Sequence, residues 1–90
     1  MQFTWDANKA ASNLKKHGVS FDEVVTVFVD PLALYVEDVL HGERTILIGQ
    51  SKKQRVLFTV FAELNEDTIR IISARRATSH ERRRYEEGEP

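Results

Sequence analysis

The C-terminal part of the chain constrains the fold most, because an alternating strand there runs directly into a helix start. Residues 68–74 are rich in β-branched side chains and predict a strand with one buried face. The motif Thr78-Ser79-His80-Glu81 is a capping box and predicts a helix to about Glu87. Arg75 and Arg76 lie between these two elements. We therefore expect guanidinium groups at a strand end beside a helix, an arrangement suited to RNA, DNA or an acidic protein.

The strand before this one is expected to be central. Residues 55–63 are mostly apolar, as in a strand that is covered on both faces. Asn65-Glu66-Asp67 predicts a tight turn that joins this strand to residues 68–74 as an antiparallel hairpin. Shorter strands are expected at residues 2–5, 32–36 and 44–49.

Two helices are expected in the N-terminal half. Asp6 is suited to be the N-cap and Gly18 the C-cap of a helix over residues 7–17. Ser20-Phe21-Asp22-Glu23 is a capping box and predicts a second helix to about Phe28, although the valines there favour a strand. The fold class is therefore α+β: two N-terminal helices packed on a small, mainly antiparallel sheet, followed by a C-terminal helix.

Composition narrows the function classes. A chain of 90 residues is expected to form one domain over residues 1–90. The absence of cysteine excludes disulfides, thiolate metal sites and a cysteine nucleophile, and the three scattered histidines do not have a metal-ligand spacing. No metal or other cofactor is expected. Without a long apolar run or the apolar core of a signal peptide, the chain is expected to be cytoplasmic and not membrane-bound.

Charge is unevenly distributed along the chain, although the net charge is only −1. No Lys or Arg occurs between Gly18 and Glu43, whereas residues 68–84 contain six arginines and one glutamate. Such a chain can present separate acidic and basic surfaces, unless folding mixes the charges through salt bridges. A polyanionic partner therefore remains compatible with the small net charge.

Several blocks of sequence, in a fixed order, extend over nearly the whole chain. The first reads Phe3-x-Trp5-Asp6-x-Asn8-Lys9-x-x-x-Asn13-x-x-Lys16-His17-Gly18-Val19-x-Phe21. The next two read Val27-Phe28-x-Asp30-Pro31 and Gly42-Glu43-Arg44. The last reads Arg70-Ile71-Ile72-Ser73-Ala74-Arg75-Arg76-Ala77-Thr78-x-x-Glu81-Arg82-x-x-Tyr85-Glu86. In order and spacing, these blocks resemble the BrnT toxins of bacterial type II toxin–antitoxin systems.

The resemblance implies a ribonuclease toxin with a RelE-like fold that needs neither metal nor nucleotide. It implies neutralisation by a BrnA-type antitoxin with a ribbon-helix-helix DNA-binding domain. Toxins of this family form a hetero-oligomer with the antitoxin, and that complex represses its own operon. The expected partners are therefore the antitoxin, an RNA substrate, and operator DNA only through the antitoxin.

Metal-free RNA cleavage needs a base for the 2′-hydroxyl proton, cations for the charged phosphorane, and an acid for the leaving 5′-oxygen. Arg70, Arg75 and Arg76 are the candidate cations. Strict alternation places Arg70, Ile72 and Ala74 on one face of the strand and Ile69, Ile71, Ser73 and Arg75 on the other. If the apolar set faces the core, Arg70 and Arg76 lie together on the solvent side. Arg75 remains an alternative to Arg76 if the strand ends before it.

Histidine titrates near neutral pH, so His17 is a candidate general base, although a histidine before a C-cap glycine also complements the helix dipole. Other residues are candidates for binding RNA. His80 lies close to the arginine pair in sequence, and Tyr85 either stacks on a base or packs on the sheet. Arg44, Lys53 and Arg55 flank one predicted hairpin, where they either grip phosphates or are soluble surface.

Three functions are compatible with these residues. An RNA endonuclease toxin accounts best for the arginines. A catalytically silent protein-binding module, such as a decayed toxin that only holds an antitoxin-like partner, is the alternative. A helix-turn-helix DNA binder is disfavoured, because the second predicted helix is acidic and has no Lys or Arg to reach phosphate or guanine.

Overall fold

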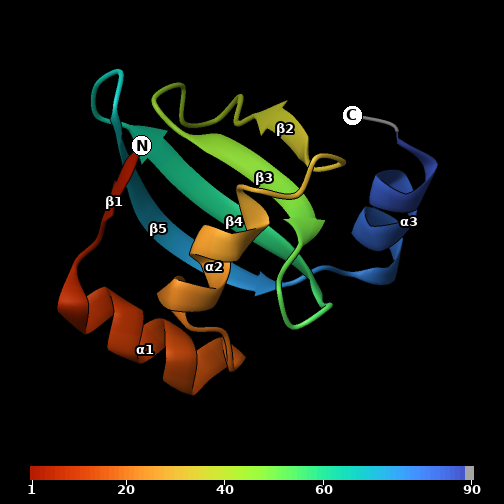
Figure 1. Ribbon diagram of the computed structural model, residues 1–90, viewed down its shortest axis with the longest axis horizontal. Coiled ribbons are helices and arrows are strands. Elements are labelled where there is room, and N and C mark those ends of the chain that lie inside the picture. The colour runs from red at the N-terminus through yellow and green to blue at the C-terminus, as the bar shows by residue number, and fades with distance from the viewer. Residues whose placement is uncertain (89–90) are drawn as a thin grey trace.

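The computed structural model describes residues 1–88, which form one five-stranded sheet with helices at one face and one end (Figure 1). In chain order the elements are β1 (Gln2–Thr4), α1 (Ala7–His17), α2 (Phe21–Val27), β2 (Leu34–Glu37), β3 (Thr45–Gln50), β4 (Val56–Glu63), β5 (Thr68–Arg76) and α3 (Ser79–Glu87). The strand order is β1-β5-β4-β3-β2, and only β1 pairs in parallel, with β5. The predicted α+β class is therefore confirmed.

Local capping explains where the helices begin. The Asp6 carboxylate accepts hydrogen bonds from the backbone N–H groups of Asn8 and Lys9, at 2.8 and 3.0 Å. The Ser20 hydroxyl accepts from the N–H of Glu23 at 3.1 Å, and α2 forms despite its valines. Capping satisfies orphan N–H groups at the helix start, whereas β-propensity depends on a sheet neighbour.

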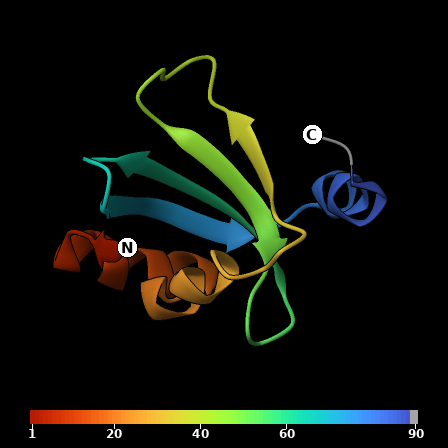
Figure 2. The same cartoon turned by 45° about the horizontal axis from the view of Figure 1, so that its top comes forward.

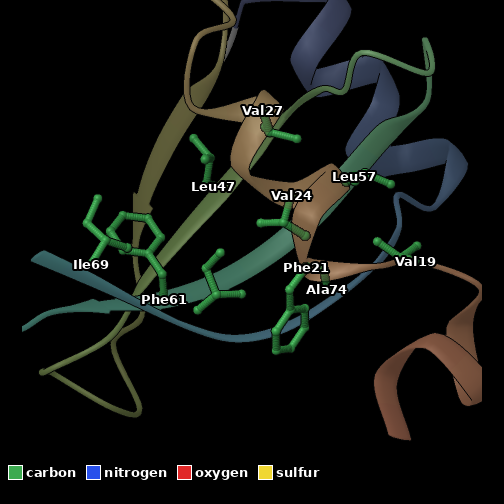
Figure 3. Packing of buried hydrophobic residues seen from close by; sticks show 10 residues of the cluster. Val19, Phe21, Val24, Val27, Leu47, Leu57, Phe61, Ile69 and Ala74 are labelled. Carbon is green, nitrogen blue, oxygen red and sulfur yellow. The ribbon is translucent and has the colours of Figure 1, made fainter. Parts of the chain in front are cut away.

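The hydrophobic core lies between α2 and the sheet. Figure 3 shows Phe21, Val24 and Val27 of α2 beside Leu47 and Phe61 of the central strands. Each of these side chains is nearly or fully buried. α1 and α2 lie on the same side of the sheet, whereas α3 lies apart from them (Figure 2). Across residues 1–88, none of the helices combines the length and the apolar composition needed to cross a membrane.

Asn13 of α1 completes the edge of β5. β1 pairs with β5 only as far as Arg70, so the backbone of Ala74 lacks a strand neighbour on that side. The Asn13 side chain fills this place: its Nδ2 donates to the Ala74 carbonyl at 2.8 Å, and its Oδ1 accepts from the Ala74 N–H at 3.1 Å. Nδ2 also donates to the Val19 carbonyl at 3.0 Å. Asn13 thereby anchors the C-terminal half of α1 to β5.

A β-bulge changes which arginines share a face. Phe61 pairs with Ile71 and Val60 pairs with Ser73, so Ile72 has no partner on β4 and the alternation shifts by one residue. Ala74 is consequently buried in the core. The prediction that Arg70 and Arg76 lie together on one face is therefore wrong.

The register after the bulge places each arginine. Arg75 pairs with Phe58 and Arg76 with Leu57. Because directly paired residues point to the same face, Arg76 lies on the side of the buried Leu57, which faces α1 and α2. Arg75 lies on the opposite side, which we call the far face, together with Arg70.

Candidate functional site

A polar cleft opens at the end of the sheet where β3 and β5 end and β4 begins. Its volume is about 290 Å³. Side chains from three separate parts of the chain line it, among them Gln54, Arg55, Arg76, Arg82, Tyr85 and Glu86. The fold therefore brings three arginines and one glutamate to the walls of one cleft.

The end of β5 and the start of α3 set one wall of the cleft. The N–H of Ala77 donates to the Val56 carbonyl at 2.9 Å, which holds the chain against β4 beyond the last strand residue. Thr78 and Glu81 then form the predicted capping box. From that start, Arg82, Tyr85 and Glu86 follow at helical spacings of three and four, so they share the stripe that faces the cleft.

Arg55 forms the second wall, and residues that do not line the cleft bind its guanidinium group. Its Nε donates to Glu23 Oε2 at 3.0 Å, and its Nη2 donates to Glu23 Oε1 and, at 3.0 Å, to the Gly18 carbonyl. The Glu23 side chain is only 2% exposed. Burial raises the pKa of the Glu23 carboxyl, but hydrogen bonds from Arg55 and Ser51 and the charge of Arg55 outweigh burial and bring the pKa below its ordinary value. Glu23 is therefore a charged carboxylate inside the protein.

Tyr85 ties α3 to the corner that follows α2. Its hydroxyl donates to Asp30 Oδ2 at 2.6 Å. Burial and this hydrogen bond raise the pKa of Tyr85 to about 12. Burial raises the pKa of Asp30, but hydrogen bonds from Tyr85 and from the N–H groups of Gln50 and Leu32 bring it below its ordinary value. Tyr85 therefore lines the cleft while its hydroxyl proton is engaged by Asp30.

Arg75 lies outside the cleft. It makes two hydrogen bonds to Glu81, at 2.8 and 2.9 Å, and its guanidinium lies 4.1 Å from the centre of the Phe58 ring. The bonds to Glu81 raise the pKa of Arg75 and lower that of Glu81. Glu81 of α3 is thus paired with an arginine of β5.

The other predicted residues are dispersed. His17 is half-buried at the end of α1, one residue before Gly18, whose carbonyl accepts from Arg55. His80 is exposed on α3, two residues before Arg82 and so on the opposite side of the helix from the cleft. Lys53 is exposed in the loop beside Arg55.

Arg44 and Arg55 lie at opposite ends of the hairpin that β3 and β4 form. Arg44 precedes β3, whereas Arg55 follows the loop at the other end of that strand. The length of β3 therefore separates them, because Thr45 pairs with Phe61 and Gln50 with Val56. Arg70 likewise pairs with Ala62, at the end of β4 away from the cleft.

Sequence reasoning missed several residues of the site. Arg82 and Glu86 were not named as site candidates, although counting from the Thr78 N-cap would have aligned them with Tyr85. Glu23 gave no such signal, since its partners Ser51 and Arg55 lie 28 and 32 residues away in the chain. Gln54 has a φ of 63°, a left-handed conformation that is uncommon for residues with a Cβ and that often accompanies functional loops.

The chemistry of the cleft suits a phosphodiester. Guanidinium groups bind phosphate oxygens in planar, charge-assisted pairs and stay charged at any biological pH. Within residues 1–88, no group of three or more His, Cys, Asp or Glu side chains is arranged to hold a metal ion. Charge stabilisation in this cleft would come from Arg55, Arg76 and Arg82.

Comparison with known proteins agrees with the resemblance seen in the sequence. A family model described as the ribonuclease toxin BrnT of type II toxin–antitoxin systems matches residues 5–81. The structure is similar to the crystal structure of the Brucella abortus ribonuclease toxin BrnT, at 22% identity and a TM-score of 0.73, over 88% of this chain and 99% of that chain. No curated protein sequence matches the chain significantly. Because the family model extends over most of the residues, this chain belongs to the BrnT family of ribonuclease toxins of type II toxin–antitoxin systems.

Proposed function

We propose that this protein is a metal-independent endoribonuclease that cleaves RNA in the polar cleft and thereby inhibits translation. The observation that supports this most is the convergence of Arg55, Arg76 and Arg82 around about 290 Å³ of space beside a carboxylate. In a partly desolvated cleft, preorganised cations stabilise a developing phosphorane more than they would in water.

The proposed reaction is an internal transesterification. The RNA 2′-oxygen forms a bond to phosphorus, and the bond from phosphorus to the 5′-oxygen breaks. The products are a 2′,3′-cyclic phosphate and a 5′-hydroxyl. One proton leaves the 2′-hydroxyl and one joins the 5′-oxygen, so the step needs no water, metal or oxidant.

We assign the proton transfers to Glu86 and His17. Glu86 is the carboxylate among the cleft residues named above. His17 is not among the residues that line the cleft, but it ends the helix that leads to Gly18, whose carbonyl accepts from Arg55. Arg55, Arg76 and Arg82 hold the phosphate. Lys53, in the adjoining loop, binds the next phosphate of the RNA. Tyr85 supports the cleft wall, because its hydroxyl is engaged by Asp30.

Four other candidates, Arg44, Arg70, Arg75 and His80, have lesser roles in this proposal. Arg44, Arg70 and His80 attract RNA at long range without contacting the reacting phosphate. Arg75 secures α3 through Glu81. Substitution of these four residues should therefore weaken cleavage less than substitution of Arg76 or Arg82.

The test uses purified protein and RNA in EDTA. The wild type is expected to cut, and Arg76→Ala with Arg82→Ala is expected to abolish cutting without unfolding the domain. Arg83→Ala is the matched control, because Arg83 is an exposed arginine on the same helix and is not among the residues that line the cleft. Glu86→Gln and His17→Asn should each lower the cleavage rate constant, because each removes a group assigned to proton transfer. Full activity of the double variant would show that the chemistry occurs elsewhere.

Membership in a type II toxin family implies an antitoxin partner. We propose that this partner is a BrnA-type antitoxin with a ribbon-helix-helix domain, that the two form a hetero-oligomer in the cytoplasm, and that only the complex binds and represses its operator. Co-expression with the neighbouring small open reading frame should yield a stable complex that shifts operator DNA. The toxin alone should not shift it.

The alternative is a catalytically silent module that only binds the antitoxin. The ion pair of Arg55 with Glu23 favours it, because this pair engages a cation that the chemistry would use. A tight antitoxin complex, combined with no RNA cleavage by the free protein in any buffer, would support that function and contradict the endoribonuclease.

A further inference from the structure

Glu23 departs from its expected local role. In a complete capping box the glutamate would reach back to the N–H of the N-cap residue, as Glu81 does to Thr78 in α3. Glu23 instead turns into the protein, where it binds the Arg55 guanidinium and accepts from the Ser51 hydroxyl at 2.6 Å. A local contact has thus been exchanged for contacts with the loop between β3 and β4.

Stability alone is a weak reason for this arrangement. A buried ion pair must offset the loss of hydration of both charges, and apolar side chains of similar size are often as stable in its place. The Glu23 side chain is 2% exposed and that of Arg55 23%, so Glu23 bears most of this penalty. What the pair does provide is one fixed orientation of a flexible, charged side chain.

The donors of Arg55 are divided in a way that leaves one edge free for a ligand. Nε and both protons of Nη2 are engaged by Glu23 and Gly18. Within residues 1–88, Nη1 makes no hydrogen bond to the protein, and Arg55 lines the cleft. The guanidinium is therefore gripped on one edge, while the two protons of Nη1 remain available.

The other two cleft arginines differ in this respect. Within the described part of the chain, the guanidinium groups of Arg76 and Arg82 make no hydrogen bonds or ion pairs with protein side chains. Both residues are exposed. Ordering a long side chain on binding costs conformational entropy, and Glu23 removes most of that cost for Arg55 before the ligand arrives.

We propose that Glu23 is a positioning residue, which holds Arg55 in the orientation that binds the phosphate of the RNA in the cleft. Ser51 supports Glu23 through its hydrogen bond to Oε2, the oxygen that also accepts from Arg55 Nε. This inference rests on the proposed function for the identity of the ligand, but it makes a separate claim about how Arg55 acts. Glu23 is expected to act only through Arg55.

A double-mutant cycle tests this claim. Glu23→Gln should lower the single-turnover cleavage rate constant by about tenfold to thirtyfold, the equivalent of the side-chain entropy that Arg55 must then lose on binding. In an Arg55→Ala background, Glu23→Gln should have no further effect. Asp22→Asn is the matched control, because Asp22 is an exposed acid next to Glu23 on the same helix, and it should leave the rate unchanged.

The readout also separates this inference from the proposed function. Affinity for a 2′-O-methyl RNA, which cannot be cut, is measured with the same four proteins of the cycle. Suppose that the wild type cuts no RNA but that Glu23→Gln weakens this binding only when Arg55 is present. The positioning role of Glu23 is then supported, and the proposed ribonuclease activity is refuted. If the wild type cuts RNA and the two substitutions have independent effects, positioning is refuted and the nuclease stands.

A second variant covers the possibility that Glu23→Gln does not fold. Ser51→Ala removes one hydrogen bond to Glu23 and keeps the ion pair. It should lower the rate in the same direction by a smaller factor, and again only in the presence of Arg55. An unchanged rate in a folded Ser51→Ala protein, with Glu23→Gln unfolded, would count against positioning and for a purely structural role of the pair.

Discussion

The attachment of α3 should depend measurably on a single hydroxyl group. α3 contains no buried residue, so its place beside the sheet relies on a few polar contacts. The hydrogen bond from Tyr85 to Asp30 and the pair of Arg75 with Glu81 are two of them. Tyr85→Phe removes the first and keeps the ring.

The magnitude follows from the environment of this hydrogen bond. A buried hydrogen bond to a charged acceptor contributes about 1.5–3 kcal/mol. Tyr85 and Asp30 are both only half-buried, so solvent screening reduces the expected contribution to about 1 kcal/mol. Since about 1.4 kcal/mol is a tenfold change in an equilibrium constant, α3 should detach about five times more often.

Amide hydrogen exchange is the suitable assay. The amides of α3 should exchange about fivefold faster in Tyr85→Phe, whereas those of β4 should not change. Tyr35→Phe is the matched control, because the structure gives the Tyr35 hydroxyl no hydrogen bond within residues 1–88. Cleavage should fall together with the loss of protection, since α3 carries Arg82 and Glu86. Unchanged exchange in α3, or equal acceleration by Tyr35→Phe, would refute the idea that this hydroxyl holds the helix.

Four further predictions concern pH, stability and the arginines. The pKa of Tyr85 is about 12 in the folded protein, against an ordinary value of 10.0. Its contribution to stability is therefore complete below pH 10 and is lost as the pH rises through 12. Ultraviolet titration should show one tyrosine that ionises at higher pH than the other, and Tyr85→Phe should remove it. Asn13→Ala should lower the free energy of unfolding by about 3 kcal/mol in urea titrations, because it orphans backbone groups of Val19 and Ala74. Within residues 1–88 the fully buried Thr59 hydroxyl has no partner, so Thr59→Val should raise that free energy by about 1 kcal/mol. Arg76→Ala should slow RNA cleavage about a hundredfold, as the loss of a transition-state donor does, whereas Arg75→Ala should mainly loosen α3; equal effects of the two would contradict the separation of the faces.

Most elements could be predicted because the forces that start and stop them act between near neighbours. The Asp6 and Thr78 caps, the capping role of the Ser20 hydroxyl and the turn at residues 65–67 were all recognised from the sequence. Each involves residues within one helical turn or one tight hairpin. Strand bounds were less accurate: β5 extends to Arg76, two residues beyond the predicted end. The family was also recognised from spaced blocks of residues, and the family model confirms it.

The assignment of side chains to the two faces of β5 was wrong beyond Ile72. Alternation along β5 was counted without the bulge at Ile72, and this reversed the faces of Ala74, Arg75 and Arg76. A bulge depends on how two strands pair, and the sequence of β5 contains no residue that predicts one. The expected grouping of Arg70 with Arg76 on one face was lost because of that single residue.

The sequence by itself determined the helices, the strands, the α+β class and the membership in a toxin family, because capping, hydrophobic alternation and spaced motifs are properties of the chain. Only the tertiary structure decided that Arg55, Arg76 and Arg82 meet in one cleft while Arg75 turns to the far face. It also decided that Glu23 binds Arg55 and that Asp30 binds Tyr85, two residues that line the cleft. These arrangements depend on strand register and on contacts across distant parts of the chain, which no local pattern encodes.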